Sequence, residues 1–137
     1  MSQKSKKGFK DNIEKLTLGN ENFRKVLYTG GHSQLVLMTL QAQEDIGLEI
    51  HKDTDQFFRF EAGEGLVLID DNEYVVGDGD AVIVPAGSKH NVVNTSKSKL
   101  LKFYTIYSPA HHKDGIVRDT KADAIRMEAE FDGIITE

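Results

Sequence analysis

Residues 79–94 read GDAVIVPAGSKHNVVN, and their order carries the clearest structural signal in the chain. Gly79 permits a tight turn, and an apolar run of strand character follows it. Pro85 and Gly87 then produce a bend, after which His90 enters a second apolar run. The stretch therefore predicts two strands joined by a short bend, with an imidazole near the start of the second strand.

Similar short apolar runs fill the chain on both sides of this stretch. Turn-forming residues separate the runs, for example Gly30-Gly31 and Asp70-Asp71-Asn72. Many short strands at close spacing, with no helical pattern among them, are typical of a closed β-barrel or sandwich. We therefore expect an all-β fold. The expected strands are residues 23–28, 35–40, 48–51, 56–60, 66–69, 73–76, 81–84, 90–93 and 100–107.

The two ends of the chain depart from this pattern. A short C-terminal helix is predicted from residue 121 to about residue 131, because Thr120 is a suitable N-cap and Asp123 can take the capping-box position. Residues 1–20 are polar and predict an N-terminal lead-in. Neither a repeat nor a low-complexity segment divides residues 21–137, so we expect them to form a single domain.

The composition restricts the class of protein. The 137 residues suit one domain, and the 39% of hydrophobic residues suffice for a core. A net charge of −5 argues against binding to a nucleic-acid backbone. The absence of cysteine excludes disulfides and thiolate ligands. The one basic cluster lies in the lead-in, where we expect a solvated tail: Lys4, Lys6, Lys7 and Lys10.

The hydrophobic runs are too short for a membrane protein. None approaches the ~18 apolar residues that span a bilayer. The basic N-terminus also lacks the apolar run of a signal peptide. We therefore expect a cytoplasmic protein with neither a membrane nor a nucleic acid as its partner.

A second segment, residues 47–51 (GLEIH), combines two potential metal ligands. Side chains alternate between the faces of a strand, so Glu49 and His51 are predicted to share one face while Leu48 and Ile50 share the other. A carboxylate and an imidazole in this arrangement can meet one ion. A charged, solvent-facing strand surface is the alternative.

Together the two segments resemble the motifs of the cupin family. The second cupin motif, G-x5-P-x-G-x2-H-x3-N, is matched at all its fixed positions: Gly79, Pro85, Gly87, His90 and Asn94. The first motif, G-x5-H-x-H-x3,4-E-x6-G, is matched in part. Glu49 takes the place of its first histidine, His51 that of its second and Gln56 that of its glutamate, whereas Gln43 stands where the family has a glycine.

Two other alignments of the first motif remain open. Anchoring the motif on Gly65 instead of Gly63 would place Phe58 at the ligand position, where it could bind no metal. Counting the loop after His51 as the shorter variant would place Asp55 there. Gln56 itself is either a weak fourth ligand or a group that orients bound water or substrate.

The resemblance implies a cupin jelly-roll barrel that holds a divalent transition metal with Glu49, His51, Gln56 and His90. Two histidines and one carboxylate are the ligands of many non-haem iron(II) sites, but they also suit Mn, Ni, Co and Zn. Strand alternation places Phe58 and Phe60 on the face of Gln56, so both are expected to line the pocket. A barrel whose site has decayed and holds no ion is the alternative.

Further pocket residues are expected near the end of the last long strand. Tyr104 is a candidate for a phenol in the pocket, with Tyr107 as the second phenol in that strand, and packing of both rings in the core is the preferred alternative. The paired His111 and His112 follow Pro109 and could form a lid over the barrel; we expect them instead in an exposed loop.

The function implied by these residues is that of a metal-dependent enzyme, dioxygenase-like or isomerase-like, acting on a small oxygen-rich molecule. A small-ligand-binding module without catalysis, and a structural cupin with an incidental ion, are the alternatives, because one fold hosts many functions. A homodimer is expected, since small cupins often dimerise, and Phe57 on the face opposite Gln56 is a candidate for the covered surface.

Overall fold

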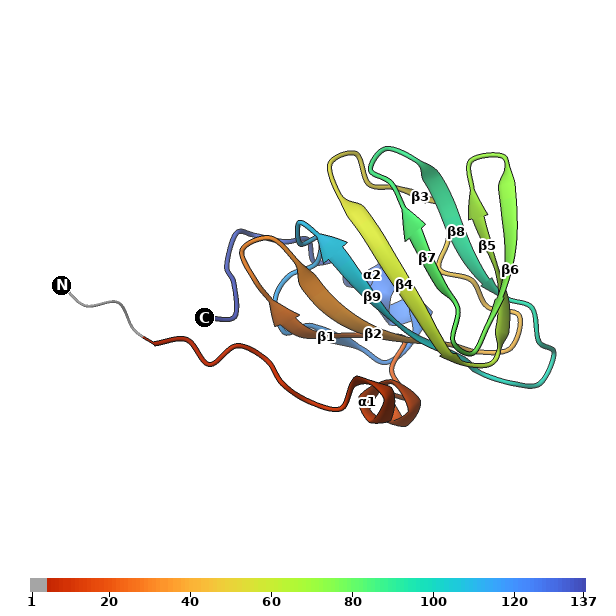
Figure 1. Cartoon of the computed structure of the whole chain (residues 1–137), viewed down its shortest axis with the longest axis horizontal. Helices are drawn as coiled ribbons and strands as arrows, with labels where there is room; N and C mark the ends of the chain where they lie inside the picture. Colours follow the sequence, from red (N-terminus) through yellow and green to blue (C-terminus); the bar gives the residue numbers. More distant parts are fainter. Residues whose placement is uncertain (1–4) are drawn as a thin grey trace.

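The computed structural model describes residues 5–137 and consists of short antiparallel strands with two short helices (Figure 1). The elements follow one another along the chain as α1 (Ile13–Gly19), β1 (Arg24–Thr29), β2 (Gln34–Leu40), β3 (Glu49–Ile50), β4 (Asp55–Ala62), β5 (Glu64–Ile69), β6 (Asn72–Gly77), β7 (Ala81–Val84), β8 (Lys89–Asn94), β9 (Leu101–Ser108), β10 (Val117–Arg118) and α2 (Lys121–Arg126).

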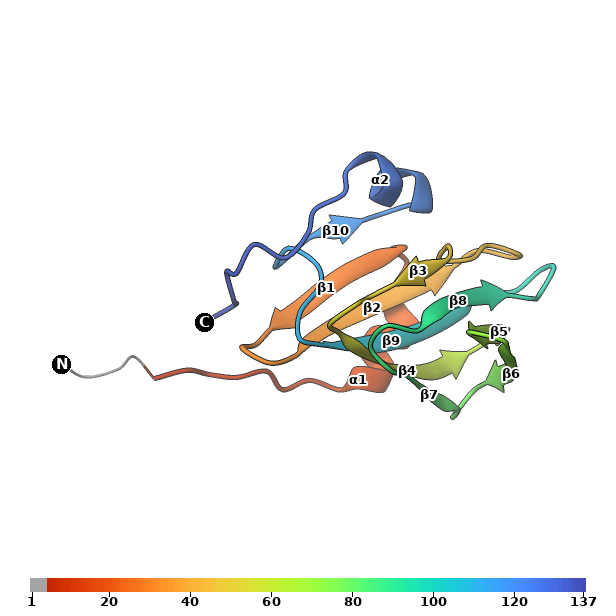
Figure 2. The same cartoon turned by 90° about the horizontal axis from the view of Figure 1, so that it is seen from above.

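The strands form two sheets that pack against each other. One sheet has six strands in the order β10-β1-β2-β9-β4-β7, and the other has four in the order β3-β8-β5-β6. Neighbours in sequence are often not neighbours in a sheet, so the chain passes repeatedly between the two layers. Figure 2 shows α2 beside β10, at the β1 end of the larger sheet. This arrangement is a double-sheet jelly roll, and the all-β prediction is confirmed.

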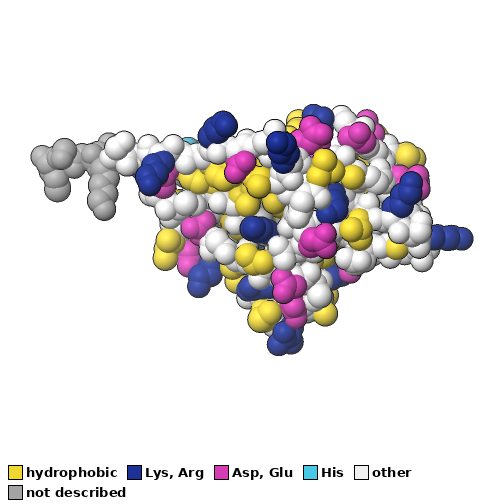
Figure 3. Space-filling model, turned by 90° about the horizontal axis from the view of Figure 1, so that it is seen from below, with side chains coloured by type: hydrophobic (Ala, Val, Ile, Leu, Met, Phe, Trp, Pro, Cys, Tyr) yellow, Lys and Arg dark blue, Asp and Glu magenta, His cyan; other side chains and the backbone are white. Residues whose placement is uncertain are grey.

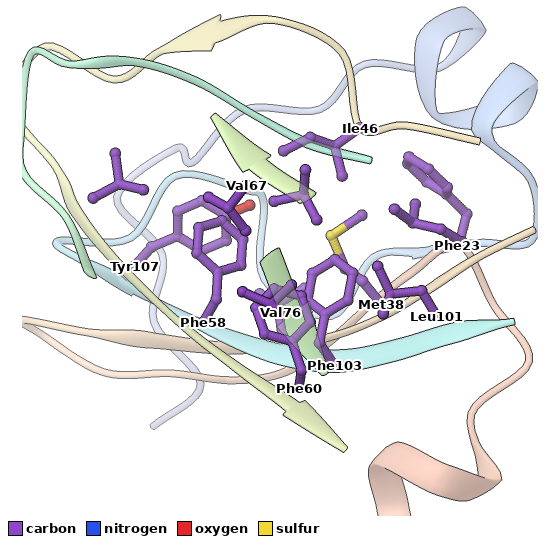
Figure 4. Packing of buried hydrophobic residues seen from close by; sticks show 14 of the residues in the cluster. Phe23, Met38, Ile46, Phe58, Phe60, Val67, Val76, Leu101, Phe103 and Tyr107 are labelled. Atoms are coloured by element: carbon purple, nitrogen blue, oxygen red, sulfur yellow. The ribbon is translucent and has the colours of Figure 1, made fainter. Parts of the chain in front are cut away.

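The core lies between the two sheets. Phe58, Phe60 and Phe103 are fully buried, and the ring of Phe103 lies 5.8 Å from that of Phe58 and 5.2 Å from that of Phe60, measured between centroids. Figure 4 shows these rings between the strands, with Tyr107 nearby. From Gln56 to Phe60 on β4 and from Phe103 to Tyr107 on β9 every second residue is buried, as the alternation of strand side chains requires.

The predicted strands agree with the observed ones to within a few residues, but the C-terminal helix is shorter than predicted. Thr120 caps α2 as expected, because its side chain accepts a hydrogen bond from the N–H of Asp123. The helix ends at Arg126 and not near residue 131. The residues that follow pair instead with the segment after β9, where His112 and Glu130 form an antiparallel bridge. Tertiary pairing outweighs helix propensity here.

The predicted lead-in contains a helix that the sequence analysis did not anticipate. Asn12 caps α1 by accepting a hydrogen bond from the N–H of Lys15. The other end of α1 is bound to the barrel, because the ammonium of Lys102 on β9 donates to the carbonyls of Leu18 and Asn20. Lys4, from the basic cluster, lies outside the described residues. The domain boundary at residue 20 stays a prediction.

Charged side chains are dispersed on the face of the molecule that Figure 3 shows. Lysines and arginines alternate there with aspartates and glutamates, and apolar side chains lie between them. Neither helix in residues 5–137 has the length and apolar character needed to cross a membrane.

Candidate metal centre

Three of the four predicted ligands meet where β3 pairs with β8. In this antiparallel pair Glu49 lies opposite His90, and His51 follows β3 directly. Strand alternation positions them, since the intervening Ile50 is 57% exposed while the side chains of Glu49 and His51 turn inward. The ligand atoms of these three residues all lie within 4.8 Å of one another.

The Nε2 atoms of His51 and His90 have no hydrogen-bond partner among residues 5–137. Nδ1 of His90 lies 3.3 Å from the carbonyl oxygen of Ser88, which leaves Nε2 with its lone pair free. Nε2 of His51 lies 2.8 Å from Oε2 of Glu49, a contact that is an ion pair only when the imidazole is protonated. Among the described residues, both Nε2 atoms are buried without a hydrogen-bond partner. Converging, unpartnered lone pairs of this kind fit a bound cation.

The protonation states also suit metal binding. Burial opposes the ionisation of Glu49, but the neighbouring His51, Arg24 and His90 outweigh it and hold the pKa of the carboxyl below its usual value. Burial lowers the pKa of His90 below its usual value. At neutral pH the carboxylate is therefore charged and this imidazole is neutral, which are the forms that coordinate a metal.

Gln56 faces the interior from β4, and its amide oxygen is available as a metal ligand. Its side chain is almost fully buried, and its Nε2 donates a hydrogen bond of 3.0 Å to Oγ1 of Thr105. This bond turns the amide so that Oε1 is left buried and without a partner among residues 5–137. Asp55, the rival ligand, lies on the exposed face of β4, where its carboxylate accepts a hydrogen bond from the N–H of Ala86.

Of the predicted pocket residues, the structure brings one to the metal centre. The ring of Phe58 lies 6.3 Å from that of His90, and Phe60 lies deeper in the core against Phe103. Tyr104 does not reach the site. It lies on the outer face of β9, where its ring packs near that of Phe57 at 6.2 Å.

Tyr107 is the phenol that faces inward from β9. Residues 103, 105 and 107 of this strand are buried and residues 104 and 106 are less so, which explains why Tyr104 and Tyr107 have different surroundings. The ring of Tyr107 meets that of His51 edge to face, with centroids 5.8 Å apart.

The prediction that His111 and His112 lie in an exposed loop is wrong. The ring of His111 packs against that of His51, and His112 is buried with its Nε2 3.1 Å from the hydroxyl of Tyr107. Oε1 of Gln34 fixes this segment, because it accepts hydrogen bonds from the backbone N–H groups of both histidines. The sequence does not indicate that the side chain of Gln34 on β2 binds this segment; only the three-dimensional structure shows it.

The remaining motif residues shape the backbone around the site. Gly79 and Gly87 both have φ near +88°, a conformation that favours glycine. The side-chain amide of Asn94 donates to the carbonyls of Leu40, Gln41 and Lys99 and so joins the end of β8 to the end of β2 and to the segment before β9. These residues hold β7 and β8 in place and contribute no ligand.

The comparison with protein families agrees with this geometry. The family model described as Cupin domain matches residues 36–107, which is more than half of the chain. The chain belongs to the cupin family. The matched segment of this cupin contains all four predicted metal ligands.

The chain is similar in sequence to two curated proteins and similar in sequence and fold to one solved structure. The chain is 46% identical over 128 residues to the uncharacterized protein YrkC of Bacillus subtilis, covering 89% of this chain and 68% of YrkC. It is 44% identical over 107 residues to the uncharacterized protein L612 of Acanthamoeba polyphaga mimivirus, covering 76% of this chain and 67% of L612. The crystal structure of BH2720 from Bacillus halodurans superposes with a TM-score of 0.86 at 45% identity, covering 88% of this chain and 96% of BH2720.

Proposed function

We propose that this cupin binds one divalent transition metal ion between Glu49, His51 and His90, with Oε1 of Gln56 as a weaker fourth donor. The observation that carries the proposal is the convergence of buried donor atoms without partners in the described chain. Leaving such atoms unpaired is costly, and a cation would satisfy them together. Imidazole and carboxylate donors fit Fe, Mn, Ni, Co or Zn.

The bound ion would supply a Lewis acid or a site for oxygen activation. The protein's own residues define the rest of the reaction site. Phe58 forms an apolar wall next to His90 and excludes water from that side. Glu49 is the one ligand with a substantially accessible side chain, 28% exposed, so its carboxylate can also accept a proton from a molecule that enters. We propose that the substrate is small and oxygen-rich, and that the reaction is dioxygenase-like or isomerase-like.

Elemental analysis of the protein purified without chelator tests the metal site. We expect close to one transition metal ion per chain. His51→Ala and His90→Ala should each abolish tight binding, because each removes a buried donor. His32→Ala is the matched control, since this histidine is exposed between β1 and β2 and is not one of the clustered ligands. A wild-type protein that takes up none of the five metals below millimolar concentration would contradict the proposal.

A substrate screen separates catalysis from simple binding. The protein is loaded in turn with Fe, Mn, Ni, Co and Zn. Oxygen uptake is then followed with catechols and β-diketones, and isomer exchange with sugar phosphates. Turnover that disappears in His51→Ala supports an enzyme. Tight binding of a probe without turnover under any metal favours a ligand-binding module.

We also propose that the protein is a cytoplasmic homodimer. Phe57, the predicted contact residue, packs with Tyr104 on the outer face of the larger sheet. Val75 on β6 and Ile83 on β7 are 85% and 66% exposed, and both strands are sheet edges, so apolar surface is available for a second copy. Light scattering should give about twice the chain mass of 15.3 kDa. A monomer at micromolar concentration would contradict the dimer.

A further inference from the structure

A cavity of about 110 Å³ opens beside the metal centre, and both Glu49 and His111 line it. Its lining comes from α2 and the residues after it, from β1, from the segment before β3 and from the segment after β9. Its size suits one small molecule and not a polymer. Apolar side chains form part of the lining: Phe23, Ile46, Ile116 and Ala124.

Besides two histidines and the glutamates Glu49, Glu128 and Glu130, the lining contains three Arg or Lys side chains, and two of these are engaged by the protein. Arg118 donates to the carbonyl oxygen of Met127 from both Nε and Nη2, at 3.1 and 2.8 Å. The ammonium of Lys121 forms an ion pair with the carboxylate of Asp45. Neither cation is free to bind a ligand without losing these contacts.

Arg24 is the third of these cationic residues, and its guanidinium is not held by such an ion pair or carbonyl contact. Arg24 is two residues before the buried Val26 on β1, so the two side chains leave the strand on the same, inward face. Within residues 5–137 it forms no ion pair, and its Nε is buried without a hydrogen-bond partner. Its guanidinium lies over the ring of Phe23, 5.3 Å from the centroid. An apolar ring on one side leaves the polar edge of the guanidinium available.

Arg24 lies close to the metal centre, because it lines the same cavity as Glu49. A divalent ion held by one carboxylate and neutral imidazoles keeps a net positive charge. With Arg24 beside it, this end of the cavity attracts an anion.

We infer that Arg24 binds the carboxylate of a small organic acid whose other oxygen atoms face the metal centre. The inference rests on the proposed metal site and names the substrate class for it. The planar fork of a guanidinium matches a carboxylate, and the buried Nε donor would gain the partner that it lacks. Short 2-oxo and 2-hydroxy acids have this combination of groups, and their carbon chain would lie against the apolar part of the lining.

Isothermal titration calorimetry with the Zn-loaded and the metal-free protein tests this role. The probes are pyruvate, a carboxylate with an adjacent oxygen, and hydroxyacetone, a neutral molecule with two adjacent oxygens. Phosphoglycolate tests whether a phosphate replaces the carboxylate. Arg24→Gln should weaken pyruvate binding by about tenfold or more, because a charge-assisted bond is lost, and leave binding of hydroxyacetone unchanged. Arg24→Lys should give an intermediate loss, because it keeps the charge but not the fork.

Lys25→Gln is the matched control. Lys25 is the next residue on β1, is exposed and carries the same charge, so its loss should not affect pyruvate binding. The Zn content of each variant is measured first. If the wild type binds no metal, the proposed metal site fails, while the carboxylate role of Arg24 is still read from the metal-free titrations.

Three results would overturn the carboxylate inference. The first is pyruvate binding in Arg24→Gln that equals that of the folded wild type. The second is an Arg24→Gln variant that loses Zn and binds both probes equally weakly, since Arg24 would then only stabilise Glu49. The third is a preference for phosphoglycolate over pyruvate that depends on Arg24.

Discussion

The imidazole ring of His111 lies against the ring of His51, with their centroids 4.1 Å apart. The two residues are distant in sequence, because His51 follows β3 and His111 follows β9. Gln34 holds the backbone at His111 in place, and the ring of Tyr107 contacts both imidazoles. The segment after β9 therefore restrains a predicted metal ligand that it does not adjoin in the chain.

Replacing His111 should loosen the metal centre without removing a ligand. In His111→Ala the ring of His51 loses its packing partner, so we expect the metal to be released about tenfold faster, as for other residues that support a ligand. His111→Phe keeps an aromatic ring and should release metal at nearly the wild-type rate. The measurement is transfer of metal to excess chelator over time. If His111→Phe loses metal as fast as His111→Ala, the imidazole has a role beyond packing.

Gln56 offers a test of the fourth donor. Gln56→Ala should weaken metal binding moderately, since an amide oxygen is a poor ligand for a transition metal. Gln56→Glu should strengthen it, because a carboxylate at the same place adds a negative charge next to the ion. Thr105→Val removes the hydroxyl that orients the amide and should reproduce part of the Gln56→Ala effect. Competition titrations with a chromogenic chelator measure all three. Wild-type affinity in Gln56→Ala would exclude Gln56 as a ligand.

The stability of the protein should fall in mild acid because of His112. Burial lowers the pKa of His112 from 6.5 to about 2. His112 therefore binds a proton near pH 6.5 in the unfolded chain but not in the folded chain. The free energy of unfolding is not reduced by this group above pH 6.5, and it decreases below that pH. The loss is about 1.4 kcal/mol per pH unit for this one group. Burial also lowers the pKa values of His90 and His111, which act in the same direction.

Urea unfolding at pH 7.5, 6.0 and 5.0 measures this dependence in the metal-free protein. His112→Gln should be less stable than the wild type at pH 7.5, because it loses the hydrogen bond between Nε2 of His112 and the hydroxyl of Tyr107. Its free energy of unfolding should, however, decrease less steeply as the pH is lowered. The slope, and not the absolute stability, is the informative quantity. Equal slopes for the two proteins would show that His112 is protonated in the folded state.

Two glycines with the same backbone conformation should respond differently to alanine. Gly63 and Gly79 have φ of 91° and 88°, so alanine is strained at both by about 1–2 kcal/mol. At Gly79 an added Cβ would meet nothing within 4 Å, whereas at Gly63 it would lie 2.3 Å from the carbonyl oxygen of Leu100. Gly63→Ala should therefore be clearly less stable than Gly79→Ala in urea. Equal losses would mean that the chain at Leu100 moves aside easily.

The local sequence was sufficient to predict most of the strands and one half of the site. Glu49 and His51 share a face because side chains of a strand alternate, and this depends on neighbouring residues alone. The turn at Gly79 and the cap at Thr120 were likewise predictable, because each depends on the conformational preference or hydrogen bonding of a few adjacent residues.

Contacts between distant segments decided the rest. The pairing of Glu49 with His90 joins residues about forty positions apart, and only the family resemblance indicated it in the sequence. The inward face of β9 holds Tyr107 and not Tyr104, because the register with β2 and β4 determines which face meets the core. The same is true of His111 on His51 and of Arg24 in the cavity. Local patterns report periodicity and backbone preference, whereas the energy of packing two distant segments depends on which surfaces the whole fold brings together.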